Sequence, residues 1–477
     1  MSEQPHAGHD EWTPPDEPVS VNRALGIALA AGEEVLAAGA GSADCAATME
    51  AAALACGLHR VSVDVTFNSL TLSWARDDDS PAVTRQRVVE QRTLDYTRLI
   101  RVHRLLDDLV RGHLTPRQAG LGLRAIRSQD YPYGRRTAEA GLAGLAGAVV
   151  LLLGGGVLGI VLAVLTTYVV LVVNRLTLSR GLPPFFGNAA AAAIVTVVAT
   201  TAYAVGLDVR PSLIVAGGII ALLPSVALLA AVQDALAGYV VTAAGRFVEV
   251  VVLLAGITSG VGAVLAVAVP LGVPLREISG QDPPGMLWAR LVGGALASLL
   301  FLVSVYAPRS LLLPAALIGL SAGGVFVALD TVGVQPLFST ALAATVAGTV
   351  AAVVAGRAHV PALVPAVAGF MPLLPGLAVY RGMFRISQAD VGLGVADVIG
   401  AIGTAGALAS GVVLGDLAAR RLRRLRSLWD ASLGAARLRT AGPHPRGRAP
   451  AARFFGPSVA LARATGLRRR RGPADGS

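Results

Sequence analysis

The sequence contains no lysine, so arginine supplies all 40 of its basic side chains. This bias, together with abundant alanine, glycine and valine, is typical of a GC-rich bacterial genome rather than of a need for guanidinium groups. Charged residues are also scarce, since they make up only 15% of the chain against about 25% in soluble domains. With 54% hydrophobic residues and a mean hydropathy of +0.64, the composition indicates an integral membrane protein.

Common signatures of enzymes and metal sites are absent as well. The chain has no nucleophile elbow, no Walker A loop and no Cys/His pair at metal-ligand spacing. Cys45 and Cys56 lie in a segment that we expect in the cytosol, where disulfides are rare, so we predict two small buried hydrophobic residues. His6 and His9 are typical of a solvated tail. We therefore expect no metal and no cofactor.

Residues 20–133 have the composition of a small soluble α+β domain, and an acidic, proline-rich tail over residues 1–19 precedes them. Apolar periodicity and helix stop signals predict four helices, with three strands between the second and the third. The helices are expected over 21–38, 42–56, 94–112 and 115–127, and the strands over 60–67, 69–75 and 83–89. Thr115 and Pro116 supply the cap and first residue of the last helix.

Ten apolar stretches follow, each near the length of about 20 residues that a membrane span needs. Their limits are 138–155, 157–174, 187–207, 212–232, 246–269, 288–306, 311–330, 336–356, 360–382 and 393–415. Only Gly154 to Gly156 separate the first two, so these are either two short spans or one span with an interfacial piece. Arginines in the front end, the loops and the tail place both termini in the cytoplasm of a bacterium, with the spans in its cytoplasmic membrane.

The two halves of this region, 138–269 and 288–417, resemble each other. PPFFGN before the third span matches QPLFST before the eighth, and the LLP that ends at Pro224 returns at Pro375. Proline breaks a helix interior, and five spans per half make equivalent helices cross in opposite directions. We therefore predict an all-α polytopic membrane protein with two inverted five-helix repeats, each with one broken helix. The alternative is that alanine-rich membrane segments look alike anywhere.

A basic tail over residues 418–477 completes the chain. Its first part places leucines and a tryptophan on one helical side and arginines on the rest, which suits an interfacial helix held by anionic lipid headgroups. The remainder is predicted to be disordered. Nucleic-acid binding is the alternative for such a charge run, but a polybasic segment just after a span is more often a topology determinant, and we expect no nucleic-acid partner.

The segments VNRALGIALAAGEEVLAAGAGSADCAATMEAAALACGL, RVSVDVTFNSLTLS and LVRGHLTPRQAGLGLRAI resemble the amino-terminal domain of the threonine/serine exporter family. LLPSVALLAAVQDALAGYVVTAAGR and PLLPGLAVYRGMF are similar to its two proline-containing membrane motifs, and the resemblance covers about residues 22–417. It implies export of L-threonine and L-serine from a bacterial cytoplasm, driven by the proton motive force. Ser225 departs from the Pro-Gly of the family pattern, which Pro375 and Gly376 keep, and this puts the substrate range in doubt.

A zwitterionic substrate needs a positive pole for its carboxylate and acceptors for its ammonium group. Helix amino termini after the two breaks can supply the first, and freed backbone carbonyls the second. Charged residues within spans are costly and usually functional or paired. The candidates for substrate binding or coupling are Pro224, Ser225, Gln233, Asp234, Arg246, Glu249, Asp330, Pro375, Gly376, Tyr380, Arg381 and Asp397.

Each charged candidate has a second interpretation. Asp234 matches the family motif and is proposed to bind the ammonium group or a coupled proton, or else it is an interfacial loop residue. Arg246 and Glu249 lie one helical turn apart and can neutralise each other. Arg381 holds a carboxylate or reaches the headgroups. Two further carboxylates, Asp330 and Asp397, relay protons or mark where a helix leaves the bilayer.

The leading hypothesis is a secondary transporter that exports small hydroxy amino acids, with protons and the amino acid as its small partners. The sequence is also compatible with a homo-oligomer, with a transporter for another small solute, and with a membrane scaffold or sensor. A membrane-anchored hydrolase with its active site in residues 20–133 is the enzymatic alternative, and Asp64, Thr66 and His103 are its weak candidates.

Overall fold

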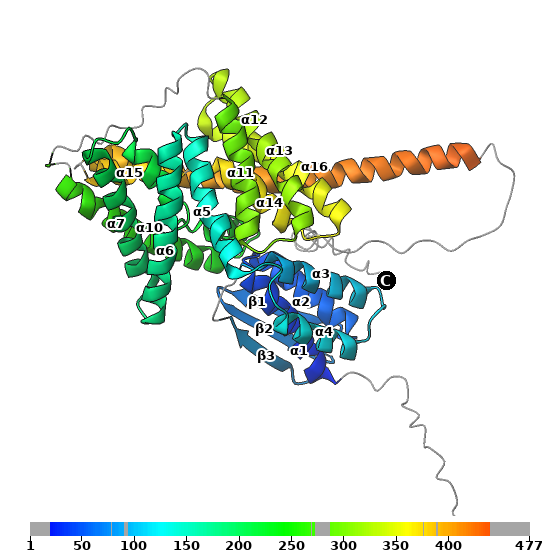
Figure 1. Cartoon of the computed structure of the whole chain (residues 1–477). Helices are drawn as coiled ribbons and strands as arrows, with labels where there is room; N and C mark the ends of the chain where they lie inside the picture. The colour runs from blue at the N-terminus through cyan, green and yellow to red at the C-terminus, as the bar shows by residue number, and fades with distance from the viewer. Residues whose placement is uncertain are drawn as a thin grey trace, which may run out of the picture.

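The computed structural model describes most of the chain between Ser20 and Leu438. The described residues are 20–77, 79–89, 94–268, 270–271, 287–374, 376–387 and 390–438. The side chains of residues 377, 379, 380, 383 and 387, and of residues after Arg421, fall outside the description. The tail predicted over residues 1–19 and the end of the basic tail after residue 438 also lie outside it. An amino-terminal unit (residues 20–133) lies against a large helical bundle (Figure 1).

Four helices and a three-stranded sheet form the amino-terminal unit. They are α1 (Val21–Ala37), α2 (Ser42–Ala55), β1 (Val61–Thr66), β2 (Ser69–Trp74), β3 (Val83–Val88), α3 (Tyr96–Val110) and α4 (Pro116–Ser128). The order of helices and strands is the predicted one. Thr115 caps α4, because its hydroxyl accepts from the Gln118 amide while the Gln118 side chain accepts from the Thr115 amide. Cys45 and Cys56 are free, buried thiols, as predicted.

The sheet is an antiparallel meander in the order β1-β2-β3. The strand predicted over residues 60–67 was wrong at Phe67, because β1 ends at Thr66. Thr66 pairs with Ser69, so Phe67 and Asn68 form the two-residue turn of the hairpin, and Phe67 has a φ of 53°. A left-handed conformation is uncommon for a bulky residue and costs free energy unless its surroundings hold it. Contacts of this turn with the helical bundle, described below, provide that hold.

The bundle consists of twelve described helices and two short 3-10 segments. Its first part holds α5 (Arg135–Leu152), α6 (Val157–Ser179), α7 (Pro184–Ala204), α8 (Pro211–Ile219), α9 (Ser225–Leu236) and α10 (Val240–Ala268). Its second part holds α11 (Leu287–Ser304), η1 (Arg309–Leu311), α12 (Leu312–Thr331), α13 (Pro336–Ala358), α14 (Leu363–Phe370), η2 (Met371–Leu373), α15 (Gly376–Ser387) and α16 (Val391–Leu438). Each predicted span coincides with a helix or with a broken pair of helices. The stretch 138–174 forms two separate helices, α5 and α6.

Seven helical segments among the described residues are long and apolar enough to cross a membrane, which makes this a mostly helical membrane protein. They are α6, α7, α10, α11, η1 with α12, α13, and the first part of α16. The other predicted spans are α5, whose first turns carry Arg135, Arg136 and Glu139, and the two broken helices, whose pieces are short.

Both proline motifs interrupt a helix, as predicted. The first helix ends at Ile219, and a new helix begins at Ser225, directly after Pro224. The second passes through the 3-10 turn η2 into extended backbone at Leu374, and α15 begins at Gly376. Pro375 itself lies outside the described residues. Helix α8 packs against α15, and Leu222 and Leu223 share a hydrophobic cluster with Ala378 and Phe384, so the two interrupted segments are neighbours.

The contact between α5 and α11 relates the two parts of the bundle. A Cβ added at Gly141 on α5 would lie 3.0 Å from the Leu300 oxygen and the Ser304 nitrogen of α11. A Cβ added at Gly293 on α11 would lie 3.0 Å from the Ala148 oxygen and 2.6 Å from the Leu152 nitrogen of α5. Each glycine lies near the start of its helix and each partner near the end, so the helices are antiparallel. Each of these residues of α5 has its counterpart in α11 at a spacing of 152 positions: Gly141 corresponds to Gly293, Ala148 to Leu300 and Leu152 to Ser304.

The remaining contacts follow the same correspondence. Helix α7 packs on α10 as α13 packs on α16, and α9 packs on α16 as α15 packs on α10. The crossings use equivalent glycines: a Cβ at Gly260 would lie 2.0 Å from the Ala189 oxygen, and one at Gly411 would lie 2.4 Å from the Ala341 oxygen. Small residues at these positions allow backbones to approach closely, as is common between membrane helices.

Helix α16 continues without interruption from Val391 to Leu438. The last predicted span and the basic helix after it are therefore one helix, because neither glycine nor proline occurs between Gly415 and Gly434 to stop it. Its carboxyl-terminal part extends away from the bundle (Figure 1).

The α5–α11 contact predicts a position-specific effect of one methyl group. Gly293→Ala places a Cβ 2.6 Å from backbone and should destabilise the protein by about 1–3 kcal/mol, as overpacking does. Gly406→Ala on α16 is the matched control, because nothing lies within 4 Å of its added Cβ. Thermal unfolding in detergent should show a lower melting temperature for Gly293→Ala only. Equal melting temperatures would contradict the close approach of these helices.

Candidate functional site: two related ion pairs and a docked amino-terminal unit

A buried ion pair lies at the end of the first broken helix. Asp234 is in the last turn of α9, and Arg246 is in the second turn of α10, with the arginine Nε 3.3 Å from Asp234 Oδ2. Their side chains are 1% and 3% exposed. Removing two charges from water costs several kcal/mol per ion, and only good mutual geometry with further hydrogen bonds repays that cost. We call this contact the first ion pair.

The amino-terminal unit supplies those further hydrogen bonds. The Ser42 amide donates to Asp234 Oδ1 at 2.6 Å, and the Ser42 hydroxyl donates to Oδ2 at 3.2 Å. The Arg246 guanidinium donates to the Ala40 carbonyl at 3.3 Å. Ser42 begins α2, so Asp234 lies at a helix amino terminus, where a carboxylate is favoured. The turn between α1 and α2 therefore seals the first ion pair from solvent.

A second ion pair occupies the equivalent place in the other part of the bundle. Arg385 on α15 lies 3.0 Å from Asp397 on α16, and their side chains are 25% and 28% exposed. A spacing of 151 positions relates Asp234 to Arg385 and Arg246 to Asp397. The charges are thus exchanged: the broken helix carries the acid in one part and the base in the other.

A further pair of salt bridges shows a similar exchange of charge, although the 151-position spacing relates only Glu139 and Arg290. Glu139 on α5 pairs with Arg175 on α6, and Arg290 on α11 pairs with Asp330 on α12 at 3.6 Å. The first helix of each part therefore carries an acid in one case and a base in the other. Arg135 adds a second partner to Glu139 at 2.9 Å. Asp330, a predicted relay, is thus part of a salt bridge at the end of α12.

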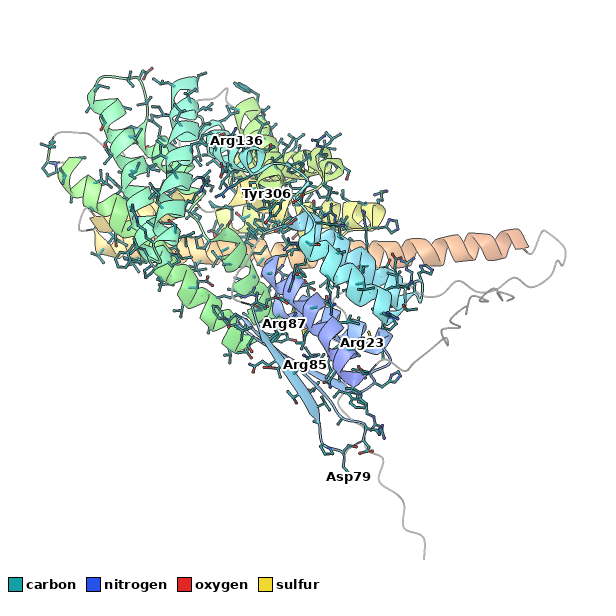
Figure 2. All side chains as sticks on the ribbon, turned by 60° about the horizontal axis from the view of Figure 1, so that its bottom comes forward. Arg23, Asp79, Arg85, Arg87, Arg136 and Tyr306 are labelled. Carbon is teal, nitrogen blue, oxygen red and sulfur yellow. The ribbon has the colours of Figure 1, made fainter. Side chains whose placement is uncertain are left out.

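Two more contacts dock the amino-terminal unit on the bundle. At the β1–β2 turn, the Phe67 amide donates to the Thr242 hydroxyl, which donates to the Val65 carbonyl, each at 3.1 Å. The Phe67 ring lies over Gly245 of α10, which accounts for the left-handed turn. At the start of α3, the Tyr96 amide donates to the Val305 carbonyl at 3.0 Å. The Tyr131 ring stacks on Tyr306 of the α11–α12 loop, with centroids 4.3 Å apart. Figure 2 labels Tyr306.

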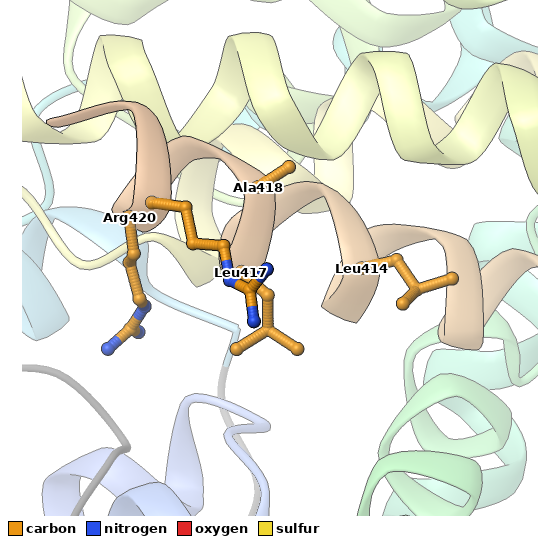
Figure 3. A pocket seen from close by; sticks show the side chains of 5 residues that line it. Leu414, Leu417, Ala418 and Arg420 are labelled. Atoms are coloured by element: carbon orange, nitrogen blue, oxygen red, sulfur yellow. The ribbon is translucent and has the colours of Figure 1, made fainter. Parts of the chain in front are cut away.

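A small cavity of about 470 Å³ lies along α16 beside the same interface, lined by Leu414, Leu417, Ala418, Arg420 and Arg421. Figure 3 shows Leu417 and Arg420 pointing from α16 to the side where the ribbon of the amino-terminal unit lies. Asp44 of α2 interacts electrostatically with charged residues of α16. Burial raises the pKa of its carboxyl to about 6, Asp416 and Asp234 add to the rise, and Arg420 opposes it.

The candidates predicted from sequence do not form one site. Pro224 and Ser225 lie at the first break, whereas Gln233, Asp234 and Arg246 lie at the contact with the amino-terminal unit. In this conformation Asp234 is engaged by Ser42 and Arg246, so a substrate ammonium group would have to replace one of them. Arg246 approaches Asp234 at 3.3 Å, and its neutralisation by Glu249 stays a prediction.

The candidates on α15 and α16 are also spread over separate places. Gly376 begins α15 after the second break, and Arg381 lies within that helix with its Nε atom buried. Asp397 faces Arg385 across the α15–α16 crossing, where a Cβ added at Gly382 would lie 2.8 Å from the Gly394 oxygen. The predicted roles of Pro375 and of the Tyr380 side chain lie outside the described residues.

Sequence reasoning missed three partners: Ser42, Ala40 and Arg385. The first two contribute a backbone amide and a carbonyl, and no residue pattern marks such groups. Arg385 had a signal, because the spacing that maps Pro224 onto Pro375 also maps Asp234 onto Arg385. For the hydrolase alternative, Asp64 and Thr66 hydrogen-bond to each other on exposed β1. Among the described residues, no cluster of His, Cys, Asp and Glu could hold a metal ion.

Comparison with known proteins identifies the family. A model described as "Putative threonine/serine exporter" matches residues 26–268, more than half of the chain, and one described as "Threonine/Serine exporter, ThrE" matches residues 290–418. The chain belongs to the threonine/serine exporter family. The first match ends at the end of α10 and the second begins in the first turn of α11, so the boundary between the matches lies between the two parts of the bundle.

Two relatives cover most of the chain. A "Threonine/serine exporter" of Corynebacterium glutamicum is 33% identical over 407 residues, which are 84% of this chain and 83% of the relative. A "Probable threonine/serine exporter" of Mycobacterium tuberculosis is 36% identical over 413 residues, 84% of this chain and 77% of the relative. No solved structure matches the chain. The family is one of transporters, so the protein is a transporter and not the hydrolase considered as an alternative.

The buried first pair predicts unequal effects of removing one charge. Asp234→Ala leaves Arg246 buried without its carboxylate and should cost about 3–5 kcal/mol of stability. Arg385→Ala is the matched control at the equivalent position and should cost about 1 kcal/mol or less, because its pair is partly exposed. Thermal unfolding in detergent measures both. Equal losses would contradict the difference in burial.

Asp44 predicts a dependence on pH with a definite sign. A carboxyl with a raised pKa binds protons more tightly in the folded protein than in the unfolded chain, whose value is 3.8. Folding stability therefore falls as pH rises from 3.8 to about 6, and the loss is complete above that range. Asp44→Asn should raise the melting temperature at pH 7.5 and leave it nearly unchanged at pH 4. A gain of the same size at both values would rule out this cause.

Proposed function

We propose that this chain is a secondary transporter that exports L-threonine, L-serine or similar small hydroxy amino acids across a bacterial cytoplasmic membrane, driven by the proton motive force. Family membership and the names of the two relatives support export of these amino acids. The observation that carries the mechanism is the pair of charge-exchanged ion pairs, Asp234–Arg246 and Arg385–Asp397, at equivalent ends of two broken helices.

The two parts of the bundle act as inverted repeats in this proposal. The antiparallel α5–α11 contact supports it, because equivalent residues face each other across a local two-fold relation. Inverted repeats place equivalent positions at opposite membrane faces, and such transporters alternate access by rocking one repeat against the other. The first ion pair then lies at the cytoplasmic face with the amino-terminal unit, and the second lies at the outer face. This proposal includes ten membrane spans and places both termini in the cytoplasm.

The ion pairs serve as gates. In the conformation described, the first pair is buried beneath Ser42 and the second is about one-quarter exposed, which corresponds to a state closed toward the cytoplasm. Loading an amino acid from the cytoplasm requires Asp234 and Arg246 to separate. Release to the outside requires Arg385 and Asp397 to separate. Protonation of a gate carboxylate removes the charge that holds its arginine, and in this way the proton gradient can open one gate.

The substrate binds between the two interrupted helices. Helix α8 and helix α15 are in contact, and both breaks leave backbone groups without helical partners. The amino terminus of α9 at Ser225 and that of α15 at Gly376 provide positive ends for the substrate carboxylate. Carbonyl groups before the breaks accept from the ammonium group.

Counterflow of labelled threonine in proteoliposomes tests the function. The purified protein should exchange threonine and serine, and an imposed pH gradient should drive accumulation of the amino acid. A panel of other small amino acids and solutes defines the substrate range. Absence of proton-dependent counterflow for threonine and serine, with exchange of another solute, would overturn this substrate assignment.

Charge exchange tests the gates. Arg385→Asp and Asp397→Arg each place like charges about 3 Å apart and should lower threonine transport at least roughly tenfold. The double variant restores an ion pair with the polarity that the first part of the bundle already uses, so transport should recover substantially. Arg180→Asp, at an exposed arginine that follows α6 and belongs to neither ion pair, is the control and should transport as the wild type does. Wild-type rates in both single variants would remove the second pair from the mechanism.

A further inference from the structure

The amino-terminal unit contains a cleft of about 530 Å³ that plays no part in the transport path proposed above. Helix α1, strand β3 and helix α4 line it, far from the two breaks in sequence. Six of its lining side chains are arginines and only one is acidic. The lining residues that matter below are Arg23, Arg85, Arg87, Arg117, Arg124, Arg127 and Glu34.

The periodicity of each element brings these arginines together. On α4, Arg117, Arg124 and Arg127 lie on one helical face with Gly120. On β3, Arg85 and Arg87 pair with Leu72 and Leu70 in register.

Since both leucines are fully buried, the two arginines of β3 share the core-facing side of the sheet, toward α1. Helices α1 and α4 pack against each other at the bottom of the cleft, where a Cβ added at Gly120 would lie 3.5 Å from the Ile27 side chain. Figure 2 labels Arg23, Arg85 and Arg87 in the amino-terminal unit.

The acidic residues of α1 neutralise only part of this charge. Glu33 pairs with Arg87 and Arg127, and Glu34 pairs with Arg127 at 2.9 Å. Arg85 donates to the Asn22 carbonyl at 2.8 Å, so its charge meets no carboxylate there.

The other three arginines, Arg23, Arg117 and Arg124, have no side-chain hydrogen bond or ion pair in the part of the chain that the structure describes. Four guanidinium charges at one concave site are thus left for an anion.

We propose that this cleft binds a small molecule with two or more phosphate groups. Guanidinium groups bind phosphate oxygens in a bidentate manner, and several of them on three elements can share a multiply charged anion. The cavity has the size of a small-molecule site, which is too small for a duplex nucleic acid. Ile27, Ala30 and Leu123 add an apolar floor that suits the organic part of a phosphate ester, as in a nucleoside diphosphate.

A bound anion has a structural route to the transport machinery. The cleft lies along α1, and α1 leads into the turn whose Ala40 carbonyl and Ser42 amide hold the first ion pair. An anion that joins α1 to α4 and β3 fixes the helix that presents this turn. The site is therefore placed to regulate transport from the amino-terminal unit.

Calorimetric titration of the full-length protein in detergent with pyrophosphate, and separately with ADP, tests the site. The wild-type protein should bind at least one of the two. The double variant Arg117→Gln/Arg124→Gln should lose affinity at least roughly tenfold, because it removes two charge-assisted contacts. Arg104→Gln, an exposed arginine of α3 outside the cleft, is the matched control and should bind as the wild type does.

Melting temperatures without ligand show whether the variants remain folded, and Arg23→Gln gives a second, independent variant if the double one does not. Equal affinity in the wild type and in the cleft variants would assign the binding to arginines elsewhere, such as the basic tail, and would overturn the proposal. Absence of binding of both probes by the wild-type protein would also overturn it.

Discussion

Burial of the Asp234–Arg246 ion pair is the constraint on which the arrangement of this protein depends. Two charges that are almost completely removed from water are stable only when each finds further polar partners. Here those partners come from another part of the chain, because the Ser42 amide and the Ala40 carbonyl belong to the amino-terminal unit. Docking of the amino-terminal unit therefore contributes directly to the electrostatic stability of the pair.

The bundle explains why the pair lies where it does. Small residues bring α5 against α11 and α7 against α10 at backbone distance, and the same pattern returns in the second part at a spacing of 151 or 152 positions. An ion pair at the end of one broken helix thus implies a counterpart at the end of the other. The counterpart exists with its charges exchanged, and its side chains are about one-quarter exposed, whereas those of the first pair are almost completely buried. In the inverted arrangement we propose, this difference makes one side of the transporter open to regulation by the amino-terminal unit.

Local chemistry in the sequence predicted much of the fold. The capping signal at Thr115 and the helix break at Pro224 each act within a few residues, and each has the predicted result. Contacts between distant segments could not be predicted in the same way. Phe67 adopts a turn conformation because α10 holds it, and Asp234 faces a backbone amide that no side-chain pattern reveals. The continuous α16 was missed because composition changes at residue 418 without a change in backbone structure.

Coupling between the two ion pairs is the central claim, and hydrogen exchange at the Ser42 amide tests it most directly. This amide donates to Asp234, so its protection reports closure of the first pair. Replacing the second pair by the neutral Arg385→Gln/Asp397→Asn removes a contact that holds the opposite gate closed and should shift the population toward closure of the first gate. The account predicts slower exchange at Ser42 in this variant than in the wild type. Unchanged or faster exchange would contradict it.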